Sequence, residues 1–363
     1  MISQSHIIDD GAALRIRWQD GTEARFHAFW LYDNSSAPEI RDPGNGQRLI
    51  TIDQVPADVR IASATPGDGR LEVAFTGNAA PVRFDADWLR QRIYDRPAAP
   101  ALVPSEVVTW DAELAGRLPV HTLDTVNADA RAKRDWLADV RRWGVARLSG
   151  MPAHQGAVID VVRLFGYLRE TNYGPTFQVR AEVSPTNLAY TNIGLQAHTD
   201  NPYRDPVPTL QLLACLENTV EGGESVVVDG FKAAQVLKAE APDDFELLAT
   251  YTARFEYAGQ SGVRLNSRRP MIETAADGEL RHIRFNSRSI APLTDIPYAR
   301  MEAYYRAYRH LSEIIDRPGM RVGFRLAPGE LFIVDNRRVL HARASFGSSG
   351  NRLLEGCYAD VDG

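Results

Sequence analysis

The feature that most constrains the fold is a series of short strand-like runs, which dominates the sequence after residue 187. These runs are TLQLLACL, ESVVVDGF, LRHIRFN, GFRLAPGELFIVDN, VLHARASF and RLLEGCYAD, and one helical pattern, YARMEAYYRAYRHLSEII, interrupts them. Many strands with few helices outside them favour an α+β domain, mainly β, whose centre is a sandwich or a barrel.

The first part of the chain has a different pattern. Residues 1 to about 97 contain the alternating runs ALRIRW, ARFHAFWL, RLEVAF and VRFDADWL between turn residues, which predict a small antiparallel β module. The stretch DRPAAPALVPSE (residues 95–106) has no apolar periodicity and is typical of a linker. Since 363 residues exceed what one core usually holds, we expect two domains, residues 1–97 and 98–363.

Composition excludes several classes of function. The net charge is −6, with no Lys/Arg block, so nucleic acid is not an expected partner. The opening MISQSHIIDDGAALRI lacks the pattern of a signal peptide, and no run of about 18 apolar residues occurs. We expect a soluble, cytoplasmic protein without a membrane partner.

The segment LQAHTDNPY contains His198 and Asp200 with one residue between them. In an extended segment both side chains point to the same face, so they could chelate one metal ion. The leading candidate for a third ligand is His341, in the strand-like run RRVLHARASF. Two imidazoles and one carboxylate form the facial set of non-haem Fe(II) oxygenases, which leaves positions open for a bidentate cosubstrate and O₂. A structural zinc site would typically include cysteine, and the chain has only Cys215 and Cys357.

A turn, GSSGN, separates His341 from a strand that begins at Arg352. The predicted hairpin brings these two residues close together, and Arg352 could grip a carboxylate through two parallel N–H donors. Tyr358, six residues later, faces the same way. Each feature alone has an ordinary alternative: a His-x-Asp turn, a packed strand histidine or a surface arginine. Their order along the chain favours the metal site.

The chain resembles the γ-butyrobetaine and trimethyllysine hydroxylase family of Fe(II)- and 2-oxoglutarate-dependent oxygenases. The motifs that carry the resemblance are FWLYDN, FDADWL, LRETNYGPTF, NLAYTNIGLQAHTD, GGESVVVDGF, PGELFIVDNRRVLHAR and RLLEGCYAD. The resemblance implies a double-stranded β-helix (jelly-roll) catalytic domain, a small N-terminal β domain, and assembly as a homodimer.

The resemblance also implies roles for individual residues. The family's iron ligands fall on His198, Asp200 and His341, and its 2-oxoglutarate anchor falls on Arg352. Leu213 and Asn187 match positions at the cosubstrate site. The aromatic cage for a trimethylammonium group falls on Tyr173, Phe177, Tyr190 and Tyr358, in agreement with the physics, because a quaternary ammonium is bound by ring faces.

Two departures from the family are informative. Relatives bind zinc through cysteines after the WLxDN motif, but Ser35, Ser36 and Ala37 stand here, so we expect no zinc in the first domain. After HTD, γ-butyrobetaine hydroxylases carry Tyr where this chain has Asn201, and FNSRS adds Arg288. The residues that we expect at an anion site are Asn201, Tyr203, Asn286, Ser287 and Arg288.

These observations predict a hydroxylase that uses Fe(II), 2-oxoglutarate and O₂ on a small trimethylammonium substrate. A guanidinium suits a group with three oxygens, so the favoured substrate is 2-(trimethylammonio)ethylphosphonate, hydroxylated next to phosphorus. The first alternative is γ-butyrobetaine hydroxylation, which forms carnitine. A jelly-roll module that binds quaternary amines without turnover and a metal-dependent hydrolase are the alternatives from other classes.

Overall fold

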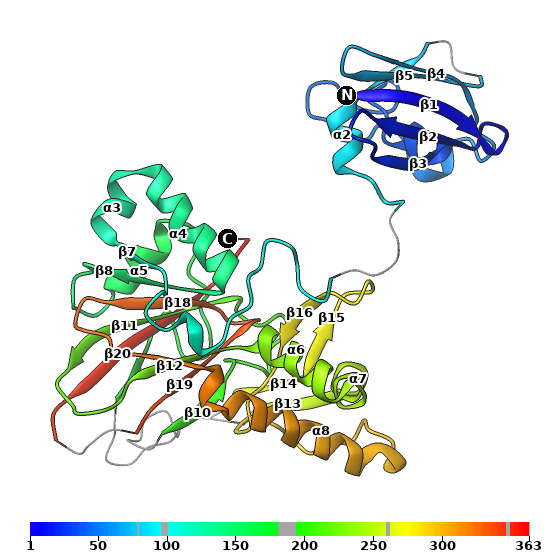
Figure 1. The fold of residues 1–363 in the computed structure, drawn as a ribbon. Helices are drawn as coiled ribbons and strands as arrows, with labels where there is room; N and C mark the ends of the chain where they lie inside the picture. The colour runs from blue at the N-terminus through cyan, green and yellow to red at the C-terminus, as the bar shows by residue number, and fades with distance from the viewer. Residues whose placement is uncertain (78–79, 96–100, 181–193, 259–261, 346–348, 363) are drawn as a thin grey trace. The chain divides into compact units, whose positions relative to one another are not determined.

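A computed structural model describes residues 1–77, 80–95, 101–180, 194–258, 262–345 and 349–362 (Figure 1). The chain divides into two compact units, Met1–Ala99 and Pro100–Gly363. In the described residues, no helix is both long and apolar enough to cross a membrane.

The first unit contains two three-stranded antiparallel sheets. One has the order β1 (Ile2–Ile8), β2 (Ala13–Trp18), β3 (Glu23–His27), and the other has β4 (Ile61–Gly67), β5 (Arg70–Phe75), β6 (Val82–Asp85). The helices α1 (Ala28–Asp33) and α2 (Ala86–Gln91) follow β3 and β6. Alternate residues of the strands are buried, and they form a core that lies wholly within this unit.

The second unit is a jelly roll built from two sheets. The larger has the order β7 (Val120–Thr122), β8 (Val145–Ser149), β18 (Leu331–Asp335), β11 (Leu210–Asn218), β20 (Arg352–Ala359), β9 (Phe177–Val179). The smaller has the order β10 (Leu195–His198), β19 (Val339–Arg343), β12 (Ser225–Asp229), β17 (Arg321–Phe324). All pairs except β7 with β8 are antiparallel. The expected fold class, an α+β jelly roll that is mainly β, is confirmed.

The central strand β11 shows how the sequence positions the interior. Leu210, Leu212 and Ala214 pack in one buried cluster with α4 (Ala130–Trp143) and α5 (Ala157–Arg163), which follow the short α3 (Leu123–Ala128). Leu213 and Cys215, on the other face, pack in a different cluster with residues of the smaller sheet. Because side chains alternate along a strand, Gln211 also faces the interior between the sheets.

A turn fixes the end of α4 against the smaller sheet. Gly144 caps the helix with φ 73°, and its N–H donates to Val140 O. A Cβ at this position would lie 2.6 Å from Val339 Cγ2, so both the positive φ and the close approach require glycine.

A third buried cluster lies at the side of the jelly roll. It includes residues of α6 (Gly230–Glu240), α7 (Pro242–Thr250) and α8 (Tyr298–Asp316). It also includes residues of two ribbons, β13 (Thr252–Ala258) with β14 (Arg264–Pro270) and β15 (Ile272–Thr274) with β16 (Leu280–Ile283). The sequence predicts α8, but it does not predict the β13–β14 ribbon.

Candidate active site

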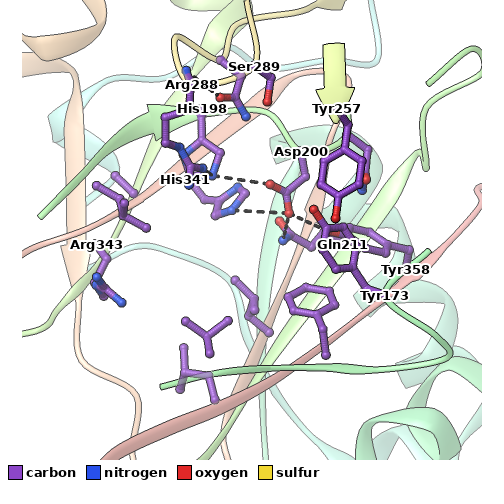
Figure 2. A pocket seen from close by; sticks show the side chains of 18 of the residues that line it. Tyr173, His198, Asp200, Gln211, Tyr257, Arg288, Ser289, His341, Arg343 and Tyr358 are labelled. Atoms are coloured by element: carbon purple, nitrogen blue, oxygen red, sulfur yellow. Dashed lines mark hydrogen bonds and ion pairs between the residues drawn. The ribbon is translucent and has the colours of Figure 1, made fainter. Parts of the chain in front are cut away.

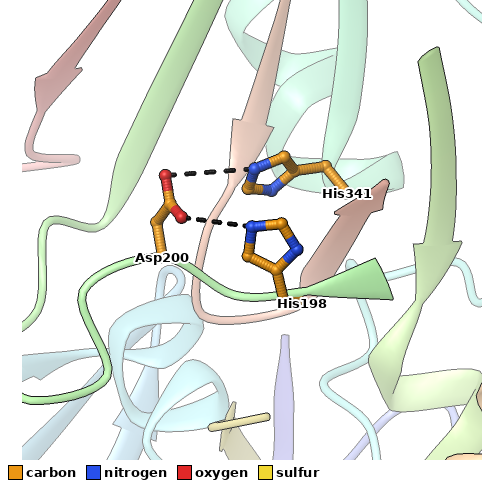
Figure 3. A group of neighbouring side chains, drawn as sticks. All are labelled: His198, Asp200 and His341. Atoms are coloured by element: carbon orange, nitrogen blue, oxygen red, sulfur yellow. Dashed lines mark ion pairs between the residues drawn. The ribbon is translucent and has the colours of Figure 1, made fainter. Parts of the chain in front are cut away.

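Three side chains meet at the end of the smaller sheet. His198 ends β10, and its Cα partner on β19 is His341. Asp200 lies just beyond β10, with Oδ1 3.4 Å from His198 Nε2 and Oδ2 3.9 Å from His341 Nε2 (Figure 3). One ligand atom from each residue lies within 4.8 Å of the others. Among the described residues, this is the only group of three or more His, Cys, Asp or Glu side chains that could hold a metal ion.

Protonation states at this cluster suit metal binding. His198 Nδ1 lies 2.8 Å from Gln196 O, so the proton sits on Nδ1 and Nε2 is left with a lone pair. Burial lowers the pKa of His341 to about 3, which keeps its imidazole neutral. Burial favours the neutral form of Asp200, but His341, His198 and Tyr358 outweigh it and lower the pKa of this carboxyl. Neutral imidazoles and an ionised carboxylate are the forms that bind a divalent metal.

Asn336 holds the backbone of the metal-ligand segment. This residue is fully buried; its Oδ1 accepts from Asp200 N at 2.7 Å, and its Nδ2 donates to Asp200 O and Pro208 O. The next residue, Asn201, has φ 53°. The sequence analysis did not identify Asn336, although an asparagine directly after the apolar run LFIVD was a possible signal.

A cavity of about 440 Å³ opens beside the three ligands. Residues of both sheets and of the β13–β14 ribbon line it (Figure 2). Leu213, expected at the cosubstrate site, is among them. Asn187 and Tyr190 lie outside the described residues.

Aromatic rings form one end of the cavity. Phe177 stacks on Tyr358 with ring centroids 5.2 Å apart, and the ring centroid of Tyr173 lies 6.1 Å from that of Phe177. The hydroxyls of Tyr203 and Tyr173 share a hydrogen bond of 3.1 Å, and the ring centroid of Tyr257 lies 5.1 Å from that of Tyr203. Burial raises the pKa of Tyr173 to about 12 and raises those of Tyr203 and Tyr358, so these phenols stay neutral. The sequence analysis did not identify Tyr257, because the ribbon that carries it was not predicted.

Arginines line other parts of the cavity. Arg352, at the start of β20, donates from Nε to Gly223 O at 3.0 Å. Arg343 lies two residues after His341 on β19 and was not singled out from the sequence. Burial lowers the pKa of each of these two arginines to about 10, so both remain charged at neutral pH. In Figure 2, Arg343 and the labelled tyrosines lie on opposite sides of the histidines and Asp200.

Arg288 approaches the metal-ligand group directly. Its Nη2 lies 2.8 Å from His198 Nε2, and its backbone N–H donates to Asn286 Oδ1. Asn201 also lines the cavity; its side-chain amide is buried and has no hydrogen-bond partner among the described residues.

The place of Ser287 at the anion site stays a prediction, and its hydroxyl is engaged by other side chains. Its hydroxyl donates to Gln196 Oε1 and accepts from the Tyr308 hydroxyl of α8, and Ser287 does not line the cavity. The neighbouring Ser289 does line it. The turn after β16 therefore directs two consecutive residues, Ser287 and Arg288, to different surroundings.

Comparison with known proteins gives the family. The family described as "Taurine catabolism dioxygenase TauD, TfdA family" matches residues 103–358, and "Gamma-butyrobetaine hydroxylase-like, N-terminal" matches residues 6–90. The chain belongs to the TauD/TfdA dioxygenase family. This dioxygenase is therefore an Fe(II)- and 2-oxoglutarate-dependent enzyme, in agreement with the buried facial set of two histidines and one carboxylate.

Relatives and solved structures agree with this assignment. The dioxygenase is 35% identical to a gamma-butyrobetaine dioxygenase of Pseudomonas sp. (strain AK-1), over 97% of this chain and 91% of the relative. It is 29% identical to the human gamma-butyrobetaine dioxygenase (99% and 95% covered) and 30% identical to the mitochondrial trimethyllysine dioxygenase of Rattus norvegicus (94% and 81% covered). An asparagine oxygenase structure with Fe(II) and succinate shares the fold, with TM-score 0.51 and 20% identity over 64% of this chain and 80% of that one.

Proposed function

We propose that this dioxygenase hydroxylates a small compound with a trimethylammonium head and an anionic end, and that γ-butyrobetaine is the first candidate substrate. The observation that carries the proposal is the group of neutral aromatic rings beside the metal-ligand residues. The names of the relatives, gamma-butyrobetaine dioxygenase and trimethyllysine dioxygenase, support the same class of substrate.

The aromatic end of the cavity suits a quaternary ammonium. Such a group has no N–H to donate, so it is bound by apolar contact and by attraction to ring faces, about 0.5 to 2 kcal/mol for each ring. Phe177, Tyr358 and Tyr173 supply adjacent rings, and Tyr358 also contacts Asp200 through its hydroxyl. A head held by these rings places the rest of a short substrate next to the metal ligands.

The residues of this chain bind and orient the reactants. Bound Fe(II) and 2-oxoglutarate supply the oxidation, in which O₂ converts 2-oxoglutarate to succinate and CO₂ and one substrate C–H bond becomes C–OH. His198, Asp200 and His341 would hold the metal, and Arg352 would hold the distal carboxylate of the cosubstrate.

A second candidate substrate is 2-(trimethylammonio)ethylphosphonate, hydroxylated at the carbon next to phosphorus. The observation that favours it is the position of Arg288, whose guanidinium donates to the Nε2 lone pair of His198. A metal would take that lone pair, so Arg288 would redirect its N–H groups to another acceptor nearby. A phosphonate offers three oxygens there, and the Asn201 amide, which has no hydrogen-bond partner in the described part of the chain, adds a donor.

A comparison of substrates tests both candidates. Succinate formation and O₂ uptake are measured with γ-butyrobetaine, the phosphonate and trimethyllysine, for the wild type and for Arg288→Met. The exposed Arg300→Met variant serves as a control. Preference for γ-butyrobetaine supports the first candidate. Preference for the phosphonate, lost in Arg288→Met but kept in Arg300→Met, supports the second. Absence of substrate-dependent succinate with all three compounds would overturn the proposal.

A further inference from the structure

The two carboxylate oxygens of Asp200 lie in different surroundings. Oδ2 accepts a hydrogen bond from the Tyr358 hydroxyl at 2.8 Å and another from Gln211 Nε2 (Figure 2). Oδ1 faces His198 Nε2 at 3.4 Å, a shorter distance than the 3.9 Å between Oδ2 and His341 Nε2. The orientation of the Gln211 amide follows from chemistry, because an ionised carboxylate can only accept hydrogen bonds and so must face the amide nitrogen.

Both donors come from one position in the larger sheet. Gln211 on β11 and Tyr358 on β20 are direct cross-strand partners, and both are almost completely buried. β11 is paired on both sides, with β18 and with β20, so the backbone that carries Gln211 is fixed by two ladders. The donors are therefore held in place before any metal binds.

We propose that Gln211 and Tyr358 are positioning residues that hold Asp200 as a one-oxygen metal ligand through Oδ1. A carboxylate oxygen offers two lone pairs in its plane, and the two hydrogen bonds use both lone pairs of Oδ2. Only Oδ1 is then left for the metal. This inference rests on the cofactors of the family and is independent of which substrate the enzyme takes.

One-oxygen ligation matters for the reaction. With His198, His341 and Oδ1 as its protein ligands, a bound iron would keep open positions for 2-oxoglutarate and O₂. If Asp200 bound through both oxygens, it would take one of these positions. Tyr358 thus has two tasks, since its ring belongs to the aromatic end and its hydroxyl directs Asp200.

Two small substitutions test the proposal. Gln211→Met keeps the length of the side chain but removes the donor, and Tyr358→Phe removes one oxygen and keeps the ring. Gln196→Met is the matched control, because this exposed glutamine lies two residues from His198 and its side-chain amide bonds to Ser287, Ser312 and Asp316 rather than to Asp200. Circular dichroism establishes that each variant is folded.

The readouts are binding measurements without substrate. We expect Gln211→Met and Tyr358→Phe each to weaken Co(II) binding by about 10- to 100-fold, the usual effect of removing an outer-shell partner. We also expect both variants to reduce the affinity of the Fe(II) protein for 2-oxoglutarate. This affinity is measured by anaerobic titration, in which the visible charge-transfer band is followed. Gln196→Met should match the wild type. The proposal is wrong if both variants are folded and bind Co(II) and 2-oxoglutarate as the wild type does. If Gln211→Met does not fold, the result for Tyr358→Phe alone decides. Neither result depends on the identity of the substrate.

Discussion

At the scale of single residues, Arg352 is the residue that we propose for binding the distal carboxylate of the cosubstrate. It is buried, and its Nε is held by Gly223 O, so its position on β20 is set by the sheet and by the neighbouring turn. We expect Arg352→Lys to raise the KM for 2-oxoglutarate by about tenfold or more, because lysine cannot present two parallel N–H donors. Steady-state kinetics with varied 2-oxoglutarate measure this effect. An unchanged KM would contradict the assignment of Arg352. As a control, the affinity of the variant for Co(II) should equal that of the wild type.

Gly356 leaves room for one ring of the aromatic end. A Cβ at this position would lie 2.3 Å from Cζ of Phe177, and Phe177 stacks on Tyr358. We expect Gly356→Ala to displace the Phe177 ring and to raise the KM for the trimethylammonium substrate by about tenfold, with a small change in the KM for 2-oxoglutarate. Equal increases in both KM values would argue against a specific effect on the aromatic end.

Sequence order located the residues with the most distinctive chemistry. Strand periodicity relates His198 to Asp200. The predicted hairpin between His341 and Arg352 is wrong, because β19 belongs to the smaller sheet and β20 to the larger. The two residues instead line the same cavity from different sheets. Gln211 was overlooked because it stands in the apolar run TLQLLACL, yet a polar residue inside a buried strand was itself a signal. The hydrogen bonds of Ser287 to Gln196 and Tyr308 could not be predicted, because they depend on contacts between distant segments, which periodicity does not reveal.

At the scale of elements, His310 of α8 links three helices. Its Nδ1 lies 2.9 Å from Asp244 Oδ2 of α7, and its Nε2 lies 3.3 Å from Glu240 Oε2 of α6. The hydrogen bond with Asp244 raises the pKa of His310 despite partial burial, and Glu240 adds to the effect. Because the pKa of His310 is higher in the folded state than in the unfolded chain, where it is about 6.5, protonation of this residue stabilises the fold. The stabilisation is fully present at pH values below about 6.5 and is lost as the pH rises through the pKa of the folded state.

His310→Gln tests this link. We expect the variant to be less stable than the wild type by about 0.5 to 1 kcal/mol near pH 6 and by less near pH 9, because the ion pairs require the protonated imidazole. Denaturant unfolding at the two pH values gives the difference. The exposed His154→Gln variant should show no such dependence. A difference that is the same at both pH values would rule out the ion pairs as its cause.

Elements with strong local signals were predicted well, and polar ribbons were not. The pattern YARMEAYYRAYRHLSEII predicts α8, and the apolar runs predict β11, β12, β18, β19 and β20. The β13–β14 ribbon was missed because RLNSRRP is polar and reads as a loop. Alternate residues of β13 are nevertheless buried, because the buried cluster with α6, α7 and α8 covers one face of the ribbon.

At the scale of the whole molecule, the first unit relies on its own apolar core. Ser35, Ser36 and Ala37 stand where the family resemblance implies sulfur ligands, and serine and alanine cannot take the place of thiolates at a zinc site. We expect elemental analysis of the iron-reconstituted protein to give about one iron and less than about 0.1 zinc per chain. The His341→Ala variant distinguishes a site in the first unit from zinc bound at the iron ligands. One zinc per chain that survives chelation in this variant would contradict the expectation.

The geometry of β20 limits how the enzyme can be changed to accept longer substrates. Arg352, Leu354 and Tyr358 of this strand all line the cavity, and Arg352 and Tyr358 are separated by six residues, or about 20 Å at the usual rise of a strand. In the proposed arrangement, cosubstrate, metal and substrate head would share this span, which the ladder with β11 makes rigid. Engineering the enzyme toward longer amines should therefore succeed through substitutions in the connecting segments around Tyr173, Asn201 and Arg288, while insertions into β20 should cost activity on every substrate.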